Sequence, residues 1–269
     1  MRLKKINFPL ILGCLFILIV FVVTVVGFFY TPYDPNQMAI RNRFIAPSKT
    51  NLFGTDQYGR DLLSRIMVGG QTTLTVSIIA VTVGMVIGIT LGAIAGYTSH
   101  AWDEFLMRIA DGIYAFPSFL LALLLVTILG SGKTPIIIAI IIGNVPVFMR
   151  ITRSNFLKLR EMDYVMAARA IGASPWRIVF KHLLPNALGP ILVQGTASFA
   201  AAILAEASLS YLGIGVQPPQ ASWGRMLREA QSFATLAPWT IVFPGIAIGL
   251  SVLGFNLIGD GINRYNSKD

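Results

Sequence analysis

The sequence predicts an all-α protein that crosses a membrane about six times. Charged residues make up only 12% of the 269 residues, while hydrophobic residues make up 55%. That charged fraction is about half of the usual share in a soluble domain. Six uncharged stretches approach or reach the roughly 20 residues that a helix needs to cross the hydrocarbon core. Together these observations indicate a polytopic membrane protein before any single residue is considered.

The candidate spans are 10–29, 74–97, 113–132, 134–149, 186–205 and 238–259. The first follows the basic segment MRLKK, but its apolar run is too long for a signal peptide and no A-x-A cleavage site follows. We therefore expect an uncleaved N-terminal transmembrane helix within residues 1–30. The stretch 134–149 is the shortest, and we expect a break or kink at Pro146.

Positive charges predict which loops face the cytoplasm, because cytoplasmic loops carry an excess of Lys and Arg. The N-terminus carries Arg2, Lys4 and Lys5, and loop 150–185 carries seven such residues. The five in loop 30–73 count against this orientation without outweighing it. We expect both termini and loop 150–185 in the cytoplasm. The net charge of +9 is then explained by orientation and by membrane lipid, and nucleic acid is not an expected partner.

Three regions follow from this topology: helix 1–30, an extracytoplasmic loop 31–73, and a core 74–269 of about five spans that includes cytoplasmic loop 150–185. Within the first loop, Asp61 and Arg65 stand four residues apart on an apolar stretch, which predicts an interfacial helix. In the last outer loop, we expect three solvated charges, Arg225, Arg228 and Glu229.

Loop 150–185 contains helix start and stop signals that predict a pair of short helices. Residues 159–171 read as one helix ended by Gly172, a residue suited to the left-handed position after a helix. Ser174 then stands at an N-cap position and Pro175 at the first helical position. The second helix is predicted over 176–184 and is closed by Pro185.

Four residues of the first short helix share a face, namely Tyr164, Ala167, Ala168 and Ile171. Small alanines between larger apolar residues suit a helix that lies in a groove of another protein. By spacing alone, packing on the chain's own membrane helices is equally compatible.

The pattern Ala167–Ala168, three residues, Gly172, then Leu184–Pro185 resembles the "EAA" loop of ABC importer permeases. The wider string YVMAARAIGAS…HLLPN resembles the dipeptide/oligopeptide/nickel branch of that family. Two positions depart from the general pattern: Met166 replaces its glutamate and His182 replaces its isoleucine.

Two further segments resemble the second permease of such importers. They are FGTDQYGRD at 53–61 and LSYLGIG at 209–215, the latter followed by Pro218–Pro219 and Ser222–Trp223–Gly224. The resemblance covers nearly the whole chain and is specific to the family, although not to its cargo.

The resemblance implies a type I-like importer permease in the inner membrane of a bacterium or archaeon. Its partners would be two cytoplasmic ATPases that hold ATP and Mg²⁺, a second permease, and an extracytoplasmic solute-binding protein. A dipeptide or oligopeptide is the expected cargo, and nickel or a metal chelate is the alternative. The residues implied to dock the ATPase are Tyr164, Ala167, Ala168, Ile171, Gly172, Ser174 and Pro175.

Two features inside the predicted spans are further candidates. Glu206 is an acid in apolar surroundings, and such acids normally face a cavity or a partner, so it is a candidate for the translocation path. Local bonding near 208–210 or an outer arginine would satisfy it equally. A strip of glycines at every fourth residue predicts close helix packing, by Gly84, Gly88, Gly92 and Gly96.

The sequence lacks the motifs of an enzyme or a metal site. No P-loop, G-x-S-x-G motif or convergent pair of carboxylates is present, and the single cysteine excludes an intrachain disulfide. His100 and His182 are isolated from other ligating residues. We expect no catalytic residue and no cofactor in this chain. An ion-driven secondary transporter is the rival class, but repeats and paired intramembrane charges are not evident.

Overall fold

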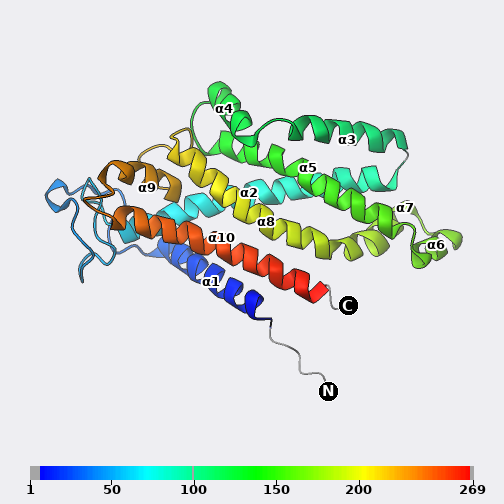
Figure 1. The fold of residues 1–269 in the computed structure, drawn as a ribbon, viewed down its shortest axis with the longest axis horizontal. Coiled ribbons are helices and arrows are strands. Elements are labelled where there is room, and N and C mark those ends of the chain that lie inside the picture. Colours follow the sequence, from blue (N-terminus) through cyan, green and yellow to red (C-terminus); the bar gives the residue numbers. More distant parts are fainter. Residues whose placement is uncertain (1–6, 99, 267–269) are drawn as a thin grey trace, which may run out of the picture.

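In the computed structural model, which describes residues 7–98 and 100–266, the chain forms an elongated bundle of helices (Figure 1). Within these residues, five helices are long and apolar enough to cross a membrane, or six if one bent pair counts as a span. The bent pair is α3 (His100–Tyr114) and α4 (Ser118–Leu129). The five are α1 (Phe8–Phe29), α2 (Leu62–Tyr97), α5 (Lys133–Leu159), α8 (Leu184–Tyr211) and α10 (Trp239–Asn266).

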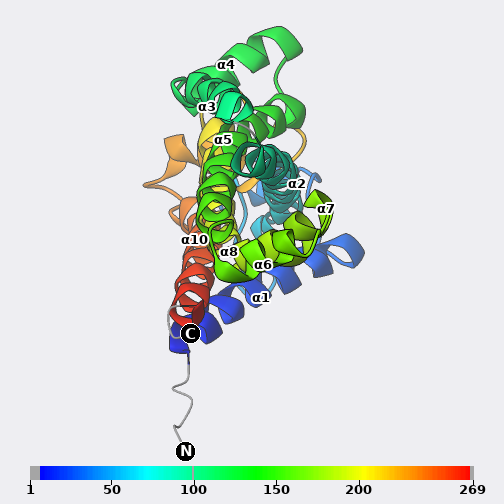
Figure 2. The ribbon, with the colours of Figure 1, turned by 90° about the vertical axis from the view of Figure 1, so that its right-hand side faces the viewer.

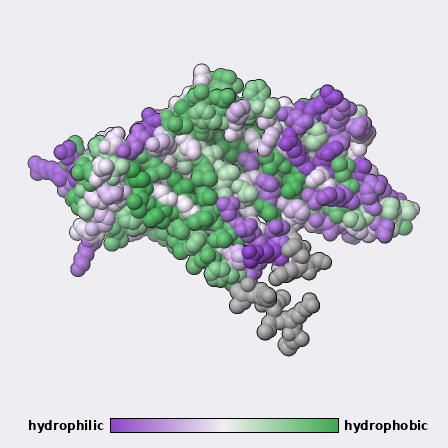
Figure 3. Space-filling view, in the orientation of Figure 1, coloured by the Kyte–Doolittle hydropathy of each residue, from purple (hydrophilic) through white to green (hydrophobic). Residues whose placement is uncertain are grey.

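The predicted all-α fold with about six spans is confirmed. On the face that Figure 3 shows, apolar residues form a band across the middle of the bundle and polar residues gather at its two ends. The start of α1 and the end of α10 lie toward the end that carries α6 (Asp163–Ala170), whereas α9 (Trp223–Ala230) lies at the other end (Figure 1). Which end faces the cytoplasm stays a prediction, and Arg2, Lys4 and Lys5 lie outside the described residues.

The helices are arranged from one edge of the bundle to the other. Seen from the end that carries α6, α3 and α4 lie at one edge and α1 and α10 at the opposite edge, with α2, α5 and α8 between them (Figure 2). The core between α2, α5 and α8 contains large buried side chains, among them Phe148, Phe156 and Ile191. A second cluster, around Trp223 and Ile203, joins α9 and α8.

Residues 61–67 do not form a separate interfacial helix, as the sequence had suggested. They are the N-cap and first turns of α2, which begins at Leu62 and runs for 36 residues. The Asp61 carboxylate caps the helix by accepting a hydrogen bond from the Ser64 amide at 2.9 Å. Ile66 is buried, and Arg65 pairs with Glu229 rather than with Asp61.

The predicted span 113–132 is not a single helix, because the chain bends by 81° between α3 and α4. The break falls at residues 115–117, and the residue before Pro117 is disfavoured in the helical conformation. The 12 residues of α4 extend only about 18 Å. By itself α4 is therefore too short to cross a hydrocarbon core of about 30 Å.

The predicted span 134–149 is extended at its C-terminal end by ten residues in the structure, because α5 runs on to Leu159 and passes through Pro146 without a break. Arg150 and Arg153 ended the apolar run in the sequence, but both are paired with carboxylates of α3. Arg150 donates to Asp111 at 2.7 Å, and Arg153 forms an ion pair with Asp103. These pairs attach α3 to α5.

The glycine strip of α2 lies against α5, and the two helices form the most extensive helix contact in the bundle. A Cβ atom at Gly92 would lie 2.5 Å from the Met149 carbonyl oxygen, and one at Gly88 would lie 2.6 Å from the Phe148 Cβ. Gly84 and Gly96 face α5 at similar range. The strip therefore serves packing within this chain.

Replacing Gly92 by alanine should destabilise the protein, because the added methyl group meets a backbone atom that can move only with the helix. We expect a loss of about 1–3 kcal/mol, the usual cost of overpacking, seen as earlier thermal unfolding in detergent. Gly249→Ala in α10 is the matched control, since its Cβ would meet nothing within 4 Å and alanine favours a helix. Equal decreases in the unfolding temperature of the two variants would contradict this packing role of Gly92.

Candidate functional site

The insert between α5 and α8 is defined by local signals that the sequence shows. Gly172 has φ +79°, the left-handed conformation predicted after the first short helix. The Ser174 hydroxyl accepts a hydrogen bond from the Arg177 amide at 3.4 Å, and Pro175 begins α7 (Pro175–Arg177). The predicted helix 159–171 is instead divided, because α5 ends at Leu159 and α6 starts after a turn.

The second short helix does not end at Pro185. From α7 the chain continues through a π-helical segment, η2 (Ile178–Leu183), directly into α8. Pro185 lies in the first turn of α8, where the interruption that was predicted does not occur. The second half of the insert and the following span thus form one continuous helix from Pro175 to Tyr211.

The face predicted for partner docking is divided between two environments. Tyr164, Ala167 and Ile171 are exposed, and Ile171 is 86% accessible. Ala168 is buried instead, together with Val165, and belongs to the side of α6 that packs on the bundle. The insert is therefore anchored by one side and presents an apolar residue on the other.

Two aromatic residues enlarge this exposed surface and were not singled out from the sequence. Trp176 is 74% accessible and stacks on Phe180 with ring centroids 5.6 Å apart. They stand four residues apart, and each is followed directly by a basic residue, Arg177 and Lys181; this spacing is a signal that could have identified them. Such exposed aromatic rings are typical of protein interfaces.

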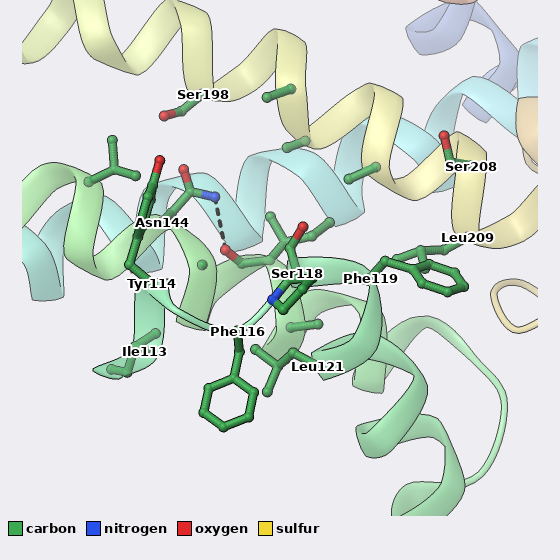
Figure 4. Close-up of a pocket in the computed structure, with 18 of the residues that line it drawn as sticks. Ile113, Tyr114, Phe116, Ser118, Phe119, Leu121, Asn144, Ser198, Ser208 and Leu209 are labelled. Carbon is green, nitrogen blue, oxygen red and sulfur yellow. Dashed lines mark hydrogen bonds between the residues drawn. The ribbon is translucent and has the colours of Figure 1, made fainter. Parts of the chain in front are cut away.

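A cavity of about 730 Å³ lies between the α3–α4 break, α5 and α8. Tyr114, Phe116 and Ser118 line it from the break, and Ser198 and Ser208 line it from α8 (Figure 4). None of the described residues that line it is charged. The volume lies within the range of small-molecule sites.

The wall that α8 contributes consists mostly of small side chains, including Ala197, Ala201 and Ala205 at every fourth position. Polar groups are few and neutral. Asn144 of α5 donates its amide to the Ile140 carbonyl at 2.8 Å, which leaves its carbonyl oxygen able to accept a hydrogen bond (Figure 4). Apart from the stripe of alanines, no pattern in the sequence indicates this cavity.

Glu206 does not line the cavity and has no exposed surface. Its Oε1 accepts a hydrogen bond from the Ser210 hydroxyl at 2.7 Å, and Oε2 has no hydrogen-bond partner within the part of the chain that the structure describes. Thr73 and Ser222 are its other polar neighbours. Local bonding is thus observed, and a role for Glu206 in the translocation path stays a prediction.

Residues 88–269 match the family of binding-protein-dependent transport system inner membrane components. The chain belongs to this family. The permease is 49% identical over 221 residues to the dipeptide transport system permease protein DppC of Alkalihalophilus pseudofirmus, a match that covers 82% of this chain and 73% of the relative. It is 41% identical over 249 residues to the glutathione transport system permease protein GsiD of Pectobacterium atrosepticum, covering 92% and 83%.

Among solved structures, the permease is similar to a chain of the inward-facing MetNI methionine ABC transporter, with a TM-score of 0.61. The match covers 76% of this chain and 95% of that chain at 22% identity, so it shows the fold alone. The predicted fold of an ABC importer permease is confirmed.

A buried ion network closes the end of the permease that carries α9. Arg60 donates to Asp56 and to Glu229, both at 2.6 Å, and Arg225 donates to Glu229 at 3.0 Å. Arg65 reaches Glu229 at 3.4 Å from the first turn of α2. Glu229 and Arg225 are therefore mostly buried rather than solvated, which corrects the expectation from the sequence.

The charge state of Glu229 follows from this network. Burial alone would raise its pKa, but the cations Arg65 and Arg60 and the hydrogen bonds from Arg225 and Arg60 outweigh burial and lower the pKa below its ordinary value. Because the pKa is lowered in the folded state, the carboxylate stabilises the fold at pH values above the ordinary pKa of glutamate. That contribution is lost as the pH falls through the lowered pKa.

We therefore expect wild type to be more stable than Glu229→Gln near neutral pH, and this advantage should shrink in acid. Unfolding of both proteins in detergent between about pH 7 and pH 3 measures the difference. Glu161→Gln is the control, because the Glu161 side chain is 71% accessible. An advantage of wild type over Glu229→Gln that does not change with pH would contradict the assigned charge state.

Proposed function

We propose that the permease forms the translocation path of an ATP-driven importer for dipeptides and other short peptides, together with a second permease. The proposal rests on the uncharged cavity of about 730 Å³ between the α3–α4 break, α5 and α8, which we call the neutral cavity. Its size suits a small ligand, and its few polar groups, such as those of Asn144 and Ser198, are suited to the amide groups of a peptide. The 49% identity to a dipeptide permease supports the same cargo class.

We infer further that the insert docks a cytoplasmic ATPase, one on each permease, and that these partners bind ATP and Mg²⁺. Support comes from the exposed apolar residues Ile171 and Trp176 on an insert whose other side is anchored to the bundle. An extracytoplasmic binding protein would deliver the cargo at the end that carries α9. ATP then acts as the ligand that shifts the pair between two states of access.

The complete importer, with both permeases and both ATPases, tests the proposal in proteoliposomes. We expect labelled dipeptide to accumulate only with ATP and with the binding protein. Accumulation of Ni²⁺ without dipeptide uptake would replace the cargo class by metal ions. Uptake that persists without ATP and follows an imposed ion gradient would refute the importer and favour a secondary transporter.

A further inference from the structure

A second cavity, of about 410 Å³, opens at the end of the permease that carries α9. It shares no lining residue with the neutral cavity and differs from it in charge. We call it the arginine pocket. Its principal walls are Arg43, Phe44 and Tyr58 of loop 30–61, and Arg225, Arg228 and Phe233 of α9 and the following turn.

The positive charge of the arginine pocket is not neutralised from within. Glu229, the acid among its lining residues, already accepts hydrogen bonds from the buried Arg60 and from Arg225. Arg228 donates a hydrogen bond to a neutral group, the Tyr211 carbonyl, at 3.3 Å. Arg43 is exposed and forms no ion pair with any residue that the structure describes.

The chemistry of the pocket suits a carboxylate. Guanidinium groups bind carboxylates through paired N–H donors, a geometry that lysine cannot supply. Phe44 and Phe233 lie against each other across the pocket with ring centroids 5.0 Å apart, so apolar surface frames the arginines. A ligand that combines an acidic group with a short apolar stem fits this arrangement.

We propose that the arginine pocket receives an acidic side chain of the extracytoplasmic binding protein, an inference that rests on the proposed importer function. The pocket is formed at the end of the molecule that carries α9, where polar residues gather on the face drawn in Figure 3. Arg41 and Lys49, both exposed, add positive charge to the same loop. Such a surface attracts an acidic partner and sets its orientation.

Titration of the purified binding protein tests the proposal on the complete importer in nanodiscs, with ATP hydrolysis as the readout. For Arg43→Glu we expect the half-saturating concentration of binding protein to rise about tenfold at low salt, and less at high salt because exposed charges are screened. Arg41→Glu is the matched control: it makes the same charge change two residues away, outside the pocket. For it we expect less than about a threefold rise.

The partner carboxylate can be located directly. Arg43→Lys keeps the charge and supplies an amine, which a zero-length carbodiimide couples to a nearby carboxylate of the added binding protein. A cross-link to one acidic residue, and recovery of Arg43→Glu by exchanging that residue for lysine, would establish the contact.

Other outcomes overturn the proposal. If Arg43→Glu and Arg41→Glu raised the half-saturating concentration of binding protein equally, the effect would come from general surface charge and not from the pocket. A raised KM for cargo with unchanged binding-protein titration would assign the pocket to cargo, and a defect seen only in nanodiscs with anionic lipid would assign it to lipid. If wild type itself is not stimulated by binding protein, the proposed importer function fails and this inference fails with it.

Discussion

Gly172→Val is expected to abolish coupled transport while the permease stays folded in the membrane. Gly172 has φ +79°, and a non-glycine residue in this region costs about 1–2 kcal/mol. No atom lies within 4 Å of the position of its Cβ, so valine would not disturb the core. The strain must instead displace α6 relative to α7, which alters the exposed surface proposed to dock the ATPase. Dipeptide uptake per ATP hydrolysed measures the effect.

Gly130→Val provides a matched control for this result. Gly130 ends α4 with φ +81° and ψ 169°, a region that is essentially restricted to glycine, and a Cβ there would also meet nothing within 4 Å, so the backbone strain is at least as large as at Gly172. It lies outside the insert. We expect this variant to retain coupled uptake. Loss of uptake in both variants, or in neither, would contradict docking through the insert.

The second large effect is expected from Ala201→Trp, which should block transport by narrowing the neutral cavity. Ala201 is on the cavity wall formed by α8, and its small side chain leaves the space that a cargo needs. An indole group would project from this wall into the cavity and narrow it, and it would not require movement of the core. We expect uptake to fall by at least about tenfold, whereas ATP hydrolysis continues.

Leu204→Trp is the control for this variant, because Leu204 is on the same helix, 46% accessible and outside the cavity. Normal uptake by Leu204→Trp together with failure of Ala201→Trp would place cargo in the cavity. Normal uptake by Ala201→Trp would show that cargo passes elsewhere.

Hydropathy predicted the existence of the spans but not where they end. α2 begins 12 residues before the predicted start at 74, since Arg65 interrupts the apolar pattern and its ion-pair partners, Asp56 and Glu229, both lie outside the helix. In the same way, Arg150 and Arg153 made the sequence after 149 look like a loop, although it forms the last turns of α5. Their carboxylate partners are on α3, which the sequence does not show. Charges that a fold pairs internally look like loop residues in a sequence.

The candidate site was predictable only where its signals are local. Gly172, Ser174 and Pro175 each act through their own backbone, so the insert could be identified from the sequence. The neutral cavity is made of alanine and serine residues that carry no chemical signature. Glu206 carried the more conspicuous signature, yet it is buried beside Ser210 and away from the cavity.

The absence of any interruption between Pro175 and Tyr211 has a mechanical consequence. These 37 residues form one uninterrupted helical segment, about 55 Å measured along its axis, with the aromatic pair Trp176 and Phe180 near one end and the alanines of the cavity wall farther along it. A flexible linker would absorb a push at that end, but a continuous helix transmits it. Spin labels placed at the two ends should therefore keep a constant separation through a transport cycle while both move relative to α1.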